Sequence, residues 1–266
     1  MDRQTVDDMV LQAIYDTVES TDEQLFVVNP NTTATIDAVV EALDTLDTLQ
    51  IRILAGESTL SKLNGAFELR ARLAKHAGSG RLSLHRYDGS TNTLLVDRDA
   101  VVLFSDIGDE TIEVRKAHSQ FLTDKYEQFC TEACAATRVD LDTPSITRIR
   151  STLSDALGTD PAEEFDRVLR LLPDCADSDA ATVALLVAGR HEKLYGDLST
   201  WGEALGVASN ATFSRKKTEL IEEHGLIETE AISRDVGRPP LRLRPADTSL
   251  RDASVDDLAD LAKSVL

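Results

Sequence analysis

The residues that could do chemistry are concentrated toward the C-terminal end of the sequence. Arg215, Lys216 and Lys217 form the only run of three basic residues, and Arg238 follows inside a Gly-Arg-Pro-Pro segment. Arginine and lysine bind phosphate oxygens, and arginine can also read a guanine edge through two parallel N–H groups. Such a run is also typical of a solvated helix surface with no binding role. The surrounding sequence is therefore needed to distinguish the two possibilities.

The local charge favours contact with a polyanion. Between Ala208 and Arg244 there are seven basic and six acidic residues, a net charge of +1, whereas the whole chain carries −19. The remainder of the chain is therefore at −20. A near-neutral segment within so acidic a chain is the electrostatic footprint expected of a surface that meets nucleic acid.

The elements around this segment indicate how the basic residues are held. A helix is predicted over 178–192, a short second helix opens at a Thr200–Glu203 capping box, and a third covers 210–224 and stops at Gly225. A β-hairpin follows from Leu226, with its tip at 237–240. Three helices and then a hairpin is the order of a winged helix-turn-helix.

The second helix of the helix-turn-helix pair enters the major groove in such domains, and the wing contacts the backbone. Phe213, Leu220 and Ile221 recur at helical spacing and are expected to pack inward. The residues expected to contact DNA are Ser209, Asn210, Thr212, Arg215, Lys216 and Arg238.

The N-terminal half alternates short apolar runs with helical sequence, which predicts βαβ units and a mostly parallel sheet. The expected elements are helix 5–19, strand 25–28, helix 32–46, strand 51–54, helix 58–76, strand 82–85, a hairpin of 93–96 and 100–104, an edge strand 111–114 and helix 117–137. The predicted fold is an α/β domain with a hairpin edge, a helical connector and an α+β winged helix.

Four segments follow from these elements. An α/β domain is expected over 1–139 and a helical connector over 140–176, with helices starting at Pro144 and at Asp160-Pro161. The winged helix-turn-helix is expected over 177–246 and an amphipathic terminal helix over 247–266, in which Val255, Leu258, Leu261 and Val265 recur after Ser254.

Loops rich in hydrogen-bond donors follow the predicted strands of the α/β domain. Ligands of open α/β sheets gather at the carboxyl ends of strands, where helix N-termini attract anions. Helix capping is the simpler explanation for each single residue. A pocket for a phosphorylated small molecule is nevertheless predicted from the set of loops, with ligand contacts from Asn31, Thr32, Thr33, Ser58, Thr59, Lys62 and Arg86.

Other chemistries find little support. His85 starts a phospholipase-like pattern, but Tyr87 and Asn92 replace its lysine and aspartate. A phosphate loop at Gly56 lacks its second glycine and its final hydroxyl residue. Cys130 and Cys134 share a helix face and are expected to be packing residues rather than metal ligands or a redox sensor. No catalytic residue, metal ligand or cofactor is predicted.

The composition indicates the environment in which the protein works. The excess of 29 aspartates and 18 glutamates over 20 arginines and only 8 lysines fits a salt-rich cytoplasm. The sequence has neither a secretory leader nor an apolar run long enough for a membrane helix, so a cytoplasmic protein is expected.

The winged-helix segment resembles a known regulator pattern. Leu205-Gly206-Val207, the run Ala211–Lys216, Leu220 and Gly225–Ile227 match it, with one extra residue in the turn. Together with the acidic composition, the hairpin at 94–103 and the wing tip at 237–240, the whole chain resembles the haloarchaeal TbsP-type transcriptional regulators, related in logic to TrmB-like repressors. The resemblance implies a homodimer that binds double-stranded DNA, regulates central carbon metabolism and senses a sugar phosphate, for example a fructose phosphate.

Two alternatives from other classes stay open. A CARF-like regulator also joins a Rossmann-type domain to a winged helix, and binds cyclic oligonucleotides in antiviral defence. An enzyme could use the winged helix only to hold its domains together, in which case no salt-dependent DNA binding is expected. The sequence specifies neither the operator nor the effector.

Overall fold

The computed structural model describes residues 6–18, 24–89, 92–97, 100–107, 110–117, 120–172, 176–233 and 239–266. The chain forms two compact units. The first comprises Met1–Asn64 and Arg72–Asp142, and the second comprises Gly65–Ala71 and Thr143–Leu266.

The first unit is built on a six-stranded sheet in the order β3-β2-β1-β4-β5-β6. Strands β1, β2 and β3 pair in parallel, and β4, β5 and β6 extend the sheet from β1 by antiparallel pairing. This α/β architecture with a hairpin edge confirms the predicted fold class. The strands are β1 (Gln24–Val28), β2 (Gln50–Ala55), β3 (Leu82–Arg86), β4 (Thr93–Val96), β5 (Ala100–Ile107) and β6 (Glu110–Ala117).

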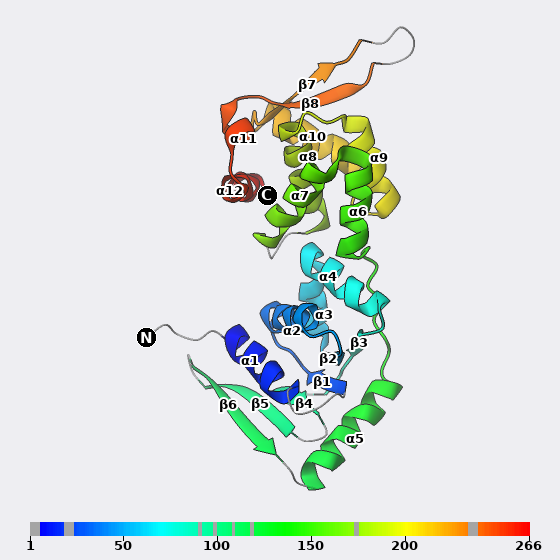
Figure 1. The fold of residues 1–266 in the computed structure, drawn as a ribbon, viewed down its shortest axis with the longest axis vertical. Coiled ribbons are helices and arrows are strands. Elements are labelled where there is room, and N and C mark those ends of the chain that lie inside the picture. The colour runs from blue at the N-terminus through cyan, green and yellow to red at the C-terminus, as the bar shows by residue number, and fades with distance from the viewer. Residues whose placement is uncertain are drawn as a thin grey trace. The chain divides into compact units, whose positions relative to one another are not determined.

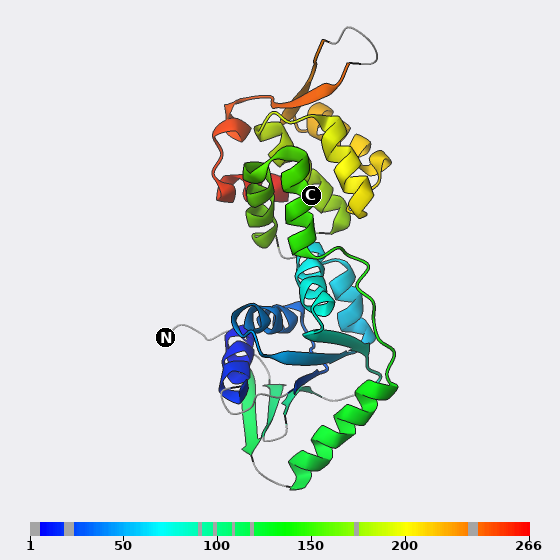
Figure 2. The same cartoon turned by 45° about the vertical axis from the view of Figure 1, so that its right-hand side comes forward.

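Helices cover the parallel strands unequally. The crossovers from β1 to β2 and from β2 to β3 both lie on one face, while α5 crosses the other (Figures 1 and 2). The α5 residue Phe129 packs with Phe26, Leu54 and Val96 of the strands. The helices are α1 (Val6–Val18), α2 (Thr33–Thr45), α3 (Glu57–Asn64), α4 (Phe67–Gly78) and α5 (Gln120–Ala135).

The helix predicted over 58–76 is wrong as a single element. It is two helices, α3 and α4, which are separated at Gly65-Ala66. Asn64 and Gly65 are weak helix formers, so a break there costs little, and burial of Ala66 and Phe67 starts the next helix.

The second unit is a helical core with a two-stranded wing. Phe165 of α7 and Trp201 of α9 meet edge-on with ring centroids 5.9 Å apart, and Trp201 Nε1 donates to Thr152 Oγ1 of α6 at 3.1 Å. Residues 146–172 thus share a core with the helices that follow. The elements are α6 (Ile146–Leu157), α7 (Thr159–Arg170), α8 (Asp177–Arg190), α9 (Tyr195–Leu205), α10 (Asn210–Glu222), β7 (Ile227–Ala231), β8 (Leu241–Pro245), α11 (Thr248–Asp252) and α12 (Val255–Val265).

Three predicted helix starts in this unit are wrong. α6 begins at Ile146 because the Ser145 hydroxyl accepts from the backbone N–H of Arg148 at 3.3 Å, which leaves Pro144 outside the helix. α7 begins at Thr159, ahead of Asp160-Pro161, because Gly158 at φ 102° allows an immediate reversal. α9 begins at Tyr195, so Thr200 lies inside the helix, where Leu198 and Trp201 are buried.

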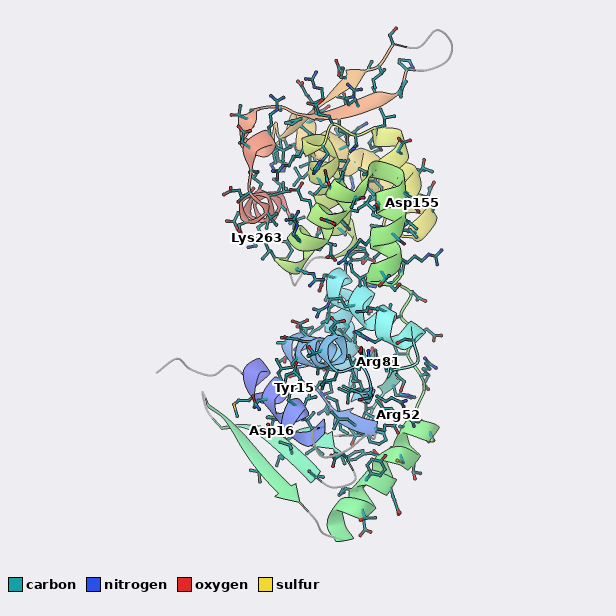
Figure 3. The ribbon with its side chains drawn as sticks, in the orientation of Figure 1. Tyr15, Asp16, Arg52, Arg81, Asp155 and Lys263 are labelled. Atoms are coloured by element: carbon teal, nitrogen blue, oxygen red, sulfur yellow. The ribbon has the colours of Figure 1, made fainter. Side chains whose placement is uncertain are left out.

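The terminal helix starts where the sequence indicates. The Ser254 hydroxyl accepts from the N–H of Asp257 at 3.1 Å, and the Asp257 carboxylate accepts from the N–H of Ser254 at 2.9 Å. Leu258, Ala259 and Ala262 are buried, and the helix packs against α7 and α8. The side chain of Lys263 on this helix is exposed (Figure 3).

Candidate nucleic-acid interface

A close crossing of α9 and α10 forms the helix-turn-helix. The side chain of Phe213, fully buried on α10, lies against the backbone of Gly202 on α9. A Cβ atom at position 202 would lie 2.2 Å from Phe213 Cε2, so only glycine permits this approach. Gly206 ends α9 in the left-handed conformation, at φ 72°. Leu220 is buried and Ile221 is partly buried against the core, which confirms the prediction that these apolar residues pack inward.

The first turn of α10 is fixed by hydrogen bonds. Ser209 is the N-cap, and its hydroxyl accepts from the backbone N–H of Thr212 at 3.1 Å. The hydroxyls of Ser209 and Thr212 are also 3.0 Å apart. The exposed side chain of Asn210 donates to the Glu203 carboxylate on α9. These contacts leave the N-terminal end of α10 ordered and open to solvent.

The exposed stripe of α10 includes one basic side chain, that of Arg215. Ser214, Arg215 and Thr218 are exposed, and the side chain of Arg215 retains 61% of its accessible surface. The neighbouring Lys216 retains only 12%. Glu219 pairs with both, at 3.3 Å from Arg215 Nη1 and 3.1 Å from Lys216 Nζ. Arg215 is therefore better placed than Lys216 to reach a base or a phosphate.

Lys217, Ser214 and Thr218 were not among the residues predicted to contact DNA. Lys217 Nζ lies 4.2 Å from the ring centroid of Tyr195, at the start of α9, and burial raises the pKa of the Tyr195 hydroxyl. Both residues line a pocket of about 450 Å³ together with Pro240 and Leu241, at the start of β8. The helical spacing of 214 and 218 with Arg215 is the signal that could have found the exposed pair.

The wing is the antiparallel pair β7–β8, in register from Ile227↔Pro245 to Ala231↔Leu241. On it Glu230 lies 3.7 Å from Arg242 and 3.5 Å from Arg244, so both cations have a carboxylate neighbour. Arg238, predicted to contact the DNA backbone, lies outside the described residues.

The predicted ligand residues of the α/β unit come together at the carboxyl ends of the parallel strands, where local contacts occupy several of them. Thr32 caps α2, and the buried Thr59 hydroxyl donates to the Pro30 carbonyl at 2.5 Å. Lys62 donates to the Asn31 carbonyl at 3.3 Å, and Arg86 pairs with Glu57. Of the other two residues, Ser58 is exposed and Thr33 is half-buried.

Other kinds of site find no support in the part of the chain that the structure describes. No group of three potential ligands there could hold a metal ion. Cys130 packs beside the α5 core cluster and Cys134 is exposed, each as a free thiol. No described helix is both long and apolar enough to cross a membrane.

Comparisons with known proteins cover both halves of the chain. A family model described as transcriptional regulator TbsP-like, N-terminal, matches residues 2–144, and one described as transcriptional regulator TbsP-like, C-terminal HTH domain, matches residues 145–263. No curated protein matches the chain. Among solved structures it is similar to TrmBL2, an archaeal chromatin protein described with a novel mode of DNA binding, at 14% identity and a TM-score of 0.38; the match spans 49% of each chain.

Proposed function

Because the chain belongs to the TbsP-like family of transcriptional regulators, with a C-terminal helix-turn-helix domain, we propose that it binds double-stranded DNA sequence-specifically as a homodimer. We further propose that its α/β unit senses a phosphorylated sugar and so adjusts the expression of central carbon metabolism.

The exposed stripe of α10 is the observation that carries the DNA-binding proposal. Arg215 extends from the middle of this helix with most of its surface free, and its only described carboxylate partner is on the same helix. A guanidinium that is held on one exchangeable ion pair can transfer to a guanine edge or a phosphate at small cost. Asn210 and Ser209, at the exposed start of the helix, complete a polar reading surface.

The direct test compares two exposed arginines of the second unit. Arg215→Ala should weaken binding to the operator by about 1–3 kcal/mol, while Arg148→Ala, which alters an exposed arginine on α6, should leave it unchanged. Gel-shift titration at matched salt, on operator fragments selected from a random pool, gives both affinities. Equal binding by Arg215→Ala and the unaltered chain would remove Arg215 from the interface.

The proposed contact of the wing with the DNA backbone has a separate test. Arg238→Ala should lower affinity for all sequences alike and reduce the salt slope by about one unit, as expected for one lost phosphate contact. A loss confined to one base position would contradict a backbone role.

The proposed homodimer is tested by light scattering at high KCl, which should give twice the 29.0 kDa chain mass.

The sensing proposal is supported by the donor-rich strand ends of the α/β unit. Calorimetry with fructose 1-phosphate and fructose 6-phosphate, with and without operator DNA, measures the coupling of the two ligands. Because linkage is reciprocal, the factor by which sugar phosphate changes DNA affinity must equal the factor by which DNA changes sugar-phosphate affinity. If cyclic oligoadenylate binds and no sugar phosphate does, a defence regulator replaces this proposal.

A further inference from the structure

The described helices cover only half of one face of the parallel sheet, and the other half of that face is polar. α5 packs over Val28 and Leu54, near the carboxyl ends of β1 and β2. Farther back along the same face lie Gln24, Arg52 and Ser83, in neighbouring strands. Parallel sheets are normally buried on both faces and apolar on both. Polar residues in the central strands therefore indicate that something other than a helix is meant to meet this face.

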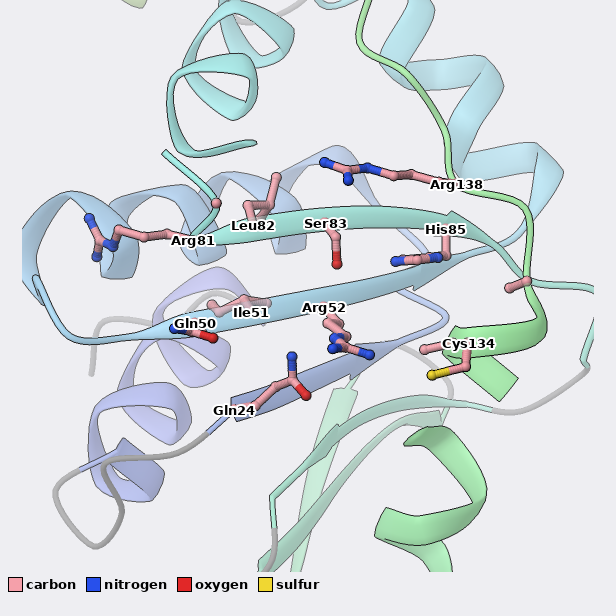
Figure 4. A pocket seen from close by; sticks show the side chains of 13 residues that line it. Gln24, Gln50, Ile51, Arg52, Arg81, Leu82, Ser83, His85, Cys134 and Arg138 are labelled. Atoms are coloured by element: carbon pink, nitrogen blue, oxygen red, sulfur yellow. The ribbon is translucent and has the colours of Figure 1, made fainter. Parts of the chain in front are cut away.

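These side chains surround a pocket of about 460 Å³ (Figure 4). Gln24 belongs to β1, Arg52 to β2 and Ser83 to β3, and the exposed Cys134 stands near the end of α5. The volume is that of a small-molecule site.

The pocket is closed on its outer edge by the segment that follows α5. The Arg86 N–H donates to the Thr137 carbonyl at 2.9 Å, and the Val139 N–H donates to the Leu84 carbonyl at 2.8 Å. This pairing sets Arg138 opposite His85, and both line the pocket. The site thus joins residues more than a hundred positions apart in the sequence.

The charge of the lining is opposite to that of the chain. Acidic residues make up 47 of 266, so a lining of thirteen residues would ordinarily contain about two. The residues that line this pocket include Arg52, Arg81 and Arg138 and no aspartate or glutamate. Figure 3 marks Arg52 and Arg81 on the same unit. The negative potential of a −19 chain repels anions, so clustered arginines with no acidic side chain in the lining supply the local positive potential that an anionic ligand needs.

The cations are held in place but not neutralised. Arg81 is tied to backbone carbonyls, with its Nη2 2.8 Å from the Leu43 oxygen. The Arg52 guanidinium carbon lies 6.0 Å from the Phe26 ring centroid. Within the described residues, neither Arg52 nor Arg138 forms an ion pair, and Nδ1 of His85 has no hydrogen-bond partner.

We propose that this pocket binds a small phosphorylated metabolite, with Arg52 and Arg138 holding the phosphate and Gln24 and Ser83 available to hydroxyl groups. The assignment of this ligand as the regulatory effector rests on the proposed function above. It moves the sensing site from the carboxyl ends of the strands to the open face of the sheet. There Arg52 and Arg138 form no ion pair within the described residues, whereas at the strand ends Arg86 is paired with Glu57.

The variants are chosen to separate the two locations. Arg52→Gln and Arg138→Gln should each weaken fructose 1-phosphate or fructose 6-phosphate binding about tenfold or more, because a charge-assisted hydrogen bond to phosphate is lost. Arg52→Lys should bind with intermediate affinity. Arg86→Gln removes an equal charge from the same strand as His85 and should stay within twofold of the unaltered chain. Calorimetry at constant KCl supplies the affinities, and circular dichroism checks that each variant is folded.

A second readout is independent of sugar recognition. Cys134 lines the pocket, whereas the half-buried Cys130, one helical turn away, does not. Pyrophosphate or a sugar phosphate should slow alkylation of Cys134 by N-ethylmaleimide several-fold, with Cys130 unchanged, as followed by peptide mass spectrometry. Arg52→Gln should abolish this protection, and unphosphorylated fructose should give none.

The outcomes separate this inference from the function it rests on. If sugar phosphates bind the Arg52 and Arg138 variants normally but lose affinity for Arg86→Gln, the strand-end loops are the site and the pocket assignment is overturned. If no sugar phosphate binds, yet pyrophosphate protects Cys134 through Arg52, the sugar-sensing proposal fails and the anion pocket stands. If no phosphorylated probe protects Cys134, the pocket assignment is wrong.

Discussion

Cationic residues are arranged differently in the two units of this chain. On α10, Arg215 and Lys216 share the carboxylate of Glu219, and on the wing Arg242 and Arg244 share that of Glu230. In the sheet-face pocket, no carboxylate stands beside Arg52 or Arg138. An exposed ion pair is worth little and exchanges easily, so the cations that we propose to contact DNA can be released to phosphate at small cost. Among the described residues, Arg52 and Arg138 have no carboxylate partner to give up, which suits a small ligand that must bind without help from a large interface.

A substitution at Gly202 should give the largest difference in behaviour between the two units. Gly202→Ala would place a Cβ atom against the Phe213 ring and should destabilise the second unit by about 2 kcal/mol, the ordinary scale of overpacking. DNA binding should weaken with it, while anion binding by the α/β unit should be unchanged. Trp201, the only tryptophan, reports unfolding of this unit by fluorescence.

The matched control lies six residues earlier on the same helix. A Cβ atom added at Gly196 would meet no atom within 4 Å, so Gly196→Ala should stabilise the unit slightly by improving helix propensity. Equal unfolding midpoints for the two variants would show that the Phe213 contact does not constrain the crossing.

Removing the hydroxyl that caps a helix should give the next largest effect. Thr32 and Ser209 each accept a backbone N–H at 3.1 Å, one at the start of α2 and the other at the start of α10. Thr32→Ala and Ser209→Ala should each cost about 1 kcal/mol of stability, measured by urea unfolding. Only Ser209→Ala should also lower DNA affinity. Loss of sugar-phosphate binding in Thr32→Ala, with its fold intact, would return the sensing site to the strand ends.

Removing the Glu219 carboxylate, which Arg215 and Lys216 share on α10, should have a smaller effect and should strengthen DNA binding. Glu219→Gln frees Arg215 and Lys216 from their common partner, so DNA affinity should rise by about 0.5 kcal/mol, the scale of an exposed pair. Glu163→Gln makes the same charge change on α7, where the side chain is exposed, and serves as the control in a gel-shift titration. An equal rise in both variants would mean that net charge, not release of the cations, is responsible.

The smallest expected effect is the pH dependence of stability that His85, in the sheet-face pocket, contributes. Burial lowers the pKa of His85 below its ordinary 6.5, and Arg52 and Arg138 act in the same direction, against an opposing contribution from the Ala136 backbone. The unfolded chain therefore binds the proton more readily than the folded one. The stability gained from neutral His85 is present above pH 6.5 and is lost as the pH falls below it.

Amide hydrogen exchange of the peptide that covers β3 tests this sign. The protection lost by the unaltered chain between pH 7.0 and 5.5, relative to His85→Gln at each pH, is the contribution of His85. A larger loss in His85→Gln would contradict the direction of the shift. Arg52→Gln should reduce the difference, because one of the charges that lower the pKa is gone.

Local signals in the sequence were sufficient for most elements. Alternation of apolar runs predicted all six strands of the α/β sheet, and Phe213, Leu220 and Ile221 indicated which side of α10 packs inward. Gly206 and Ser254 marked helix ends because backbone conformation and capping are decided by near neighbours. The helix starts at α6, α7 and α9 were misplaced where competing local signals were settled by Ser145, Gly158 and the burial of Leu198.

The tertiary structure alone decided which cations are free. The alternation in Ile51-Arg52-Ile53 and Leu82-Ser83-Leu84 was visible in the sequence and could have indicated one polar face. Nothing local, however, shows that α5 stops short of covering that face or that Arg138 pairs across from His85. Equally, the basic triplet is continuous in sequence, yet helical geometry exposes Arg215, half-buries Lys216 and lays Lys217 over Tyr195. Residue type is fixed by the sequence, but exposure and pairing depend on what distant segments bring alongside.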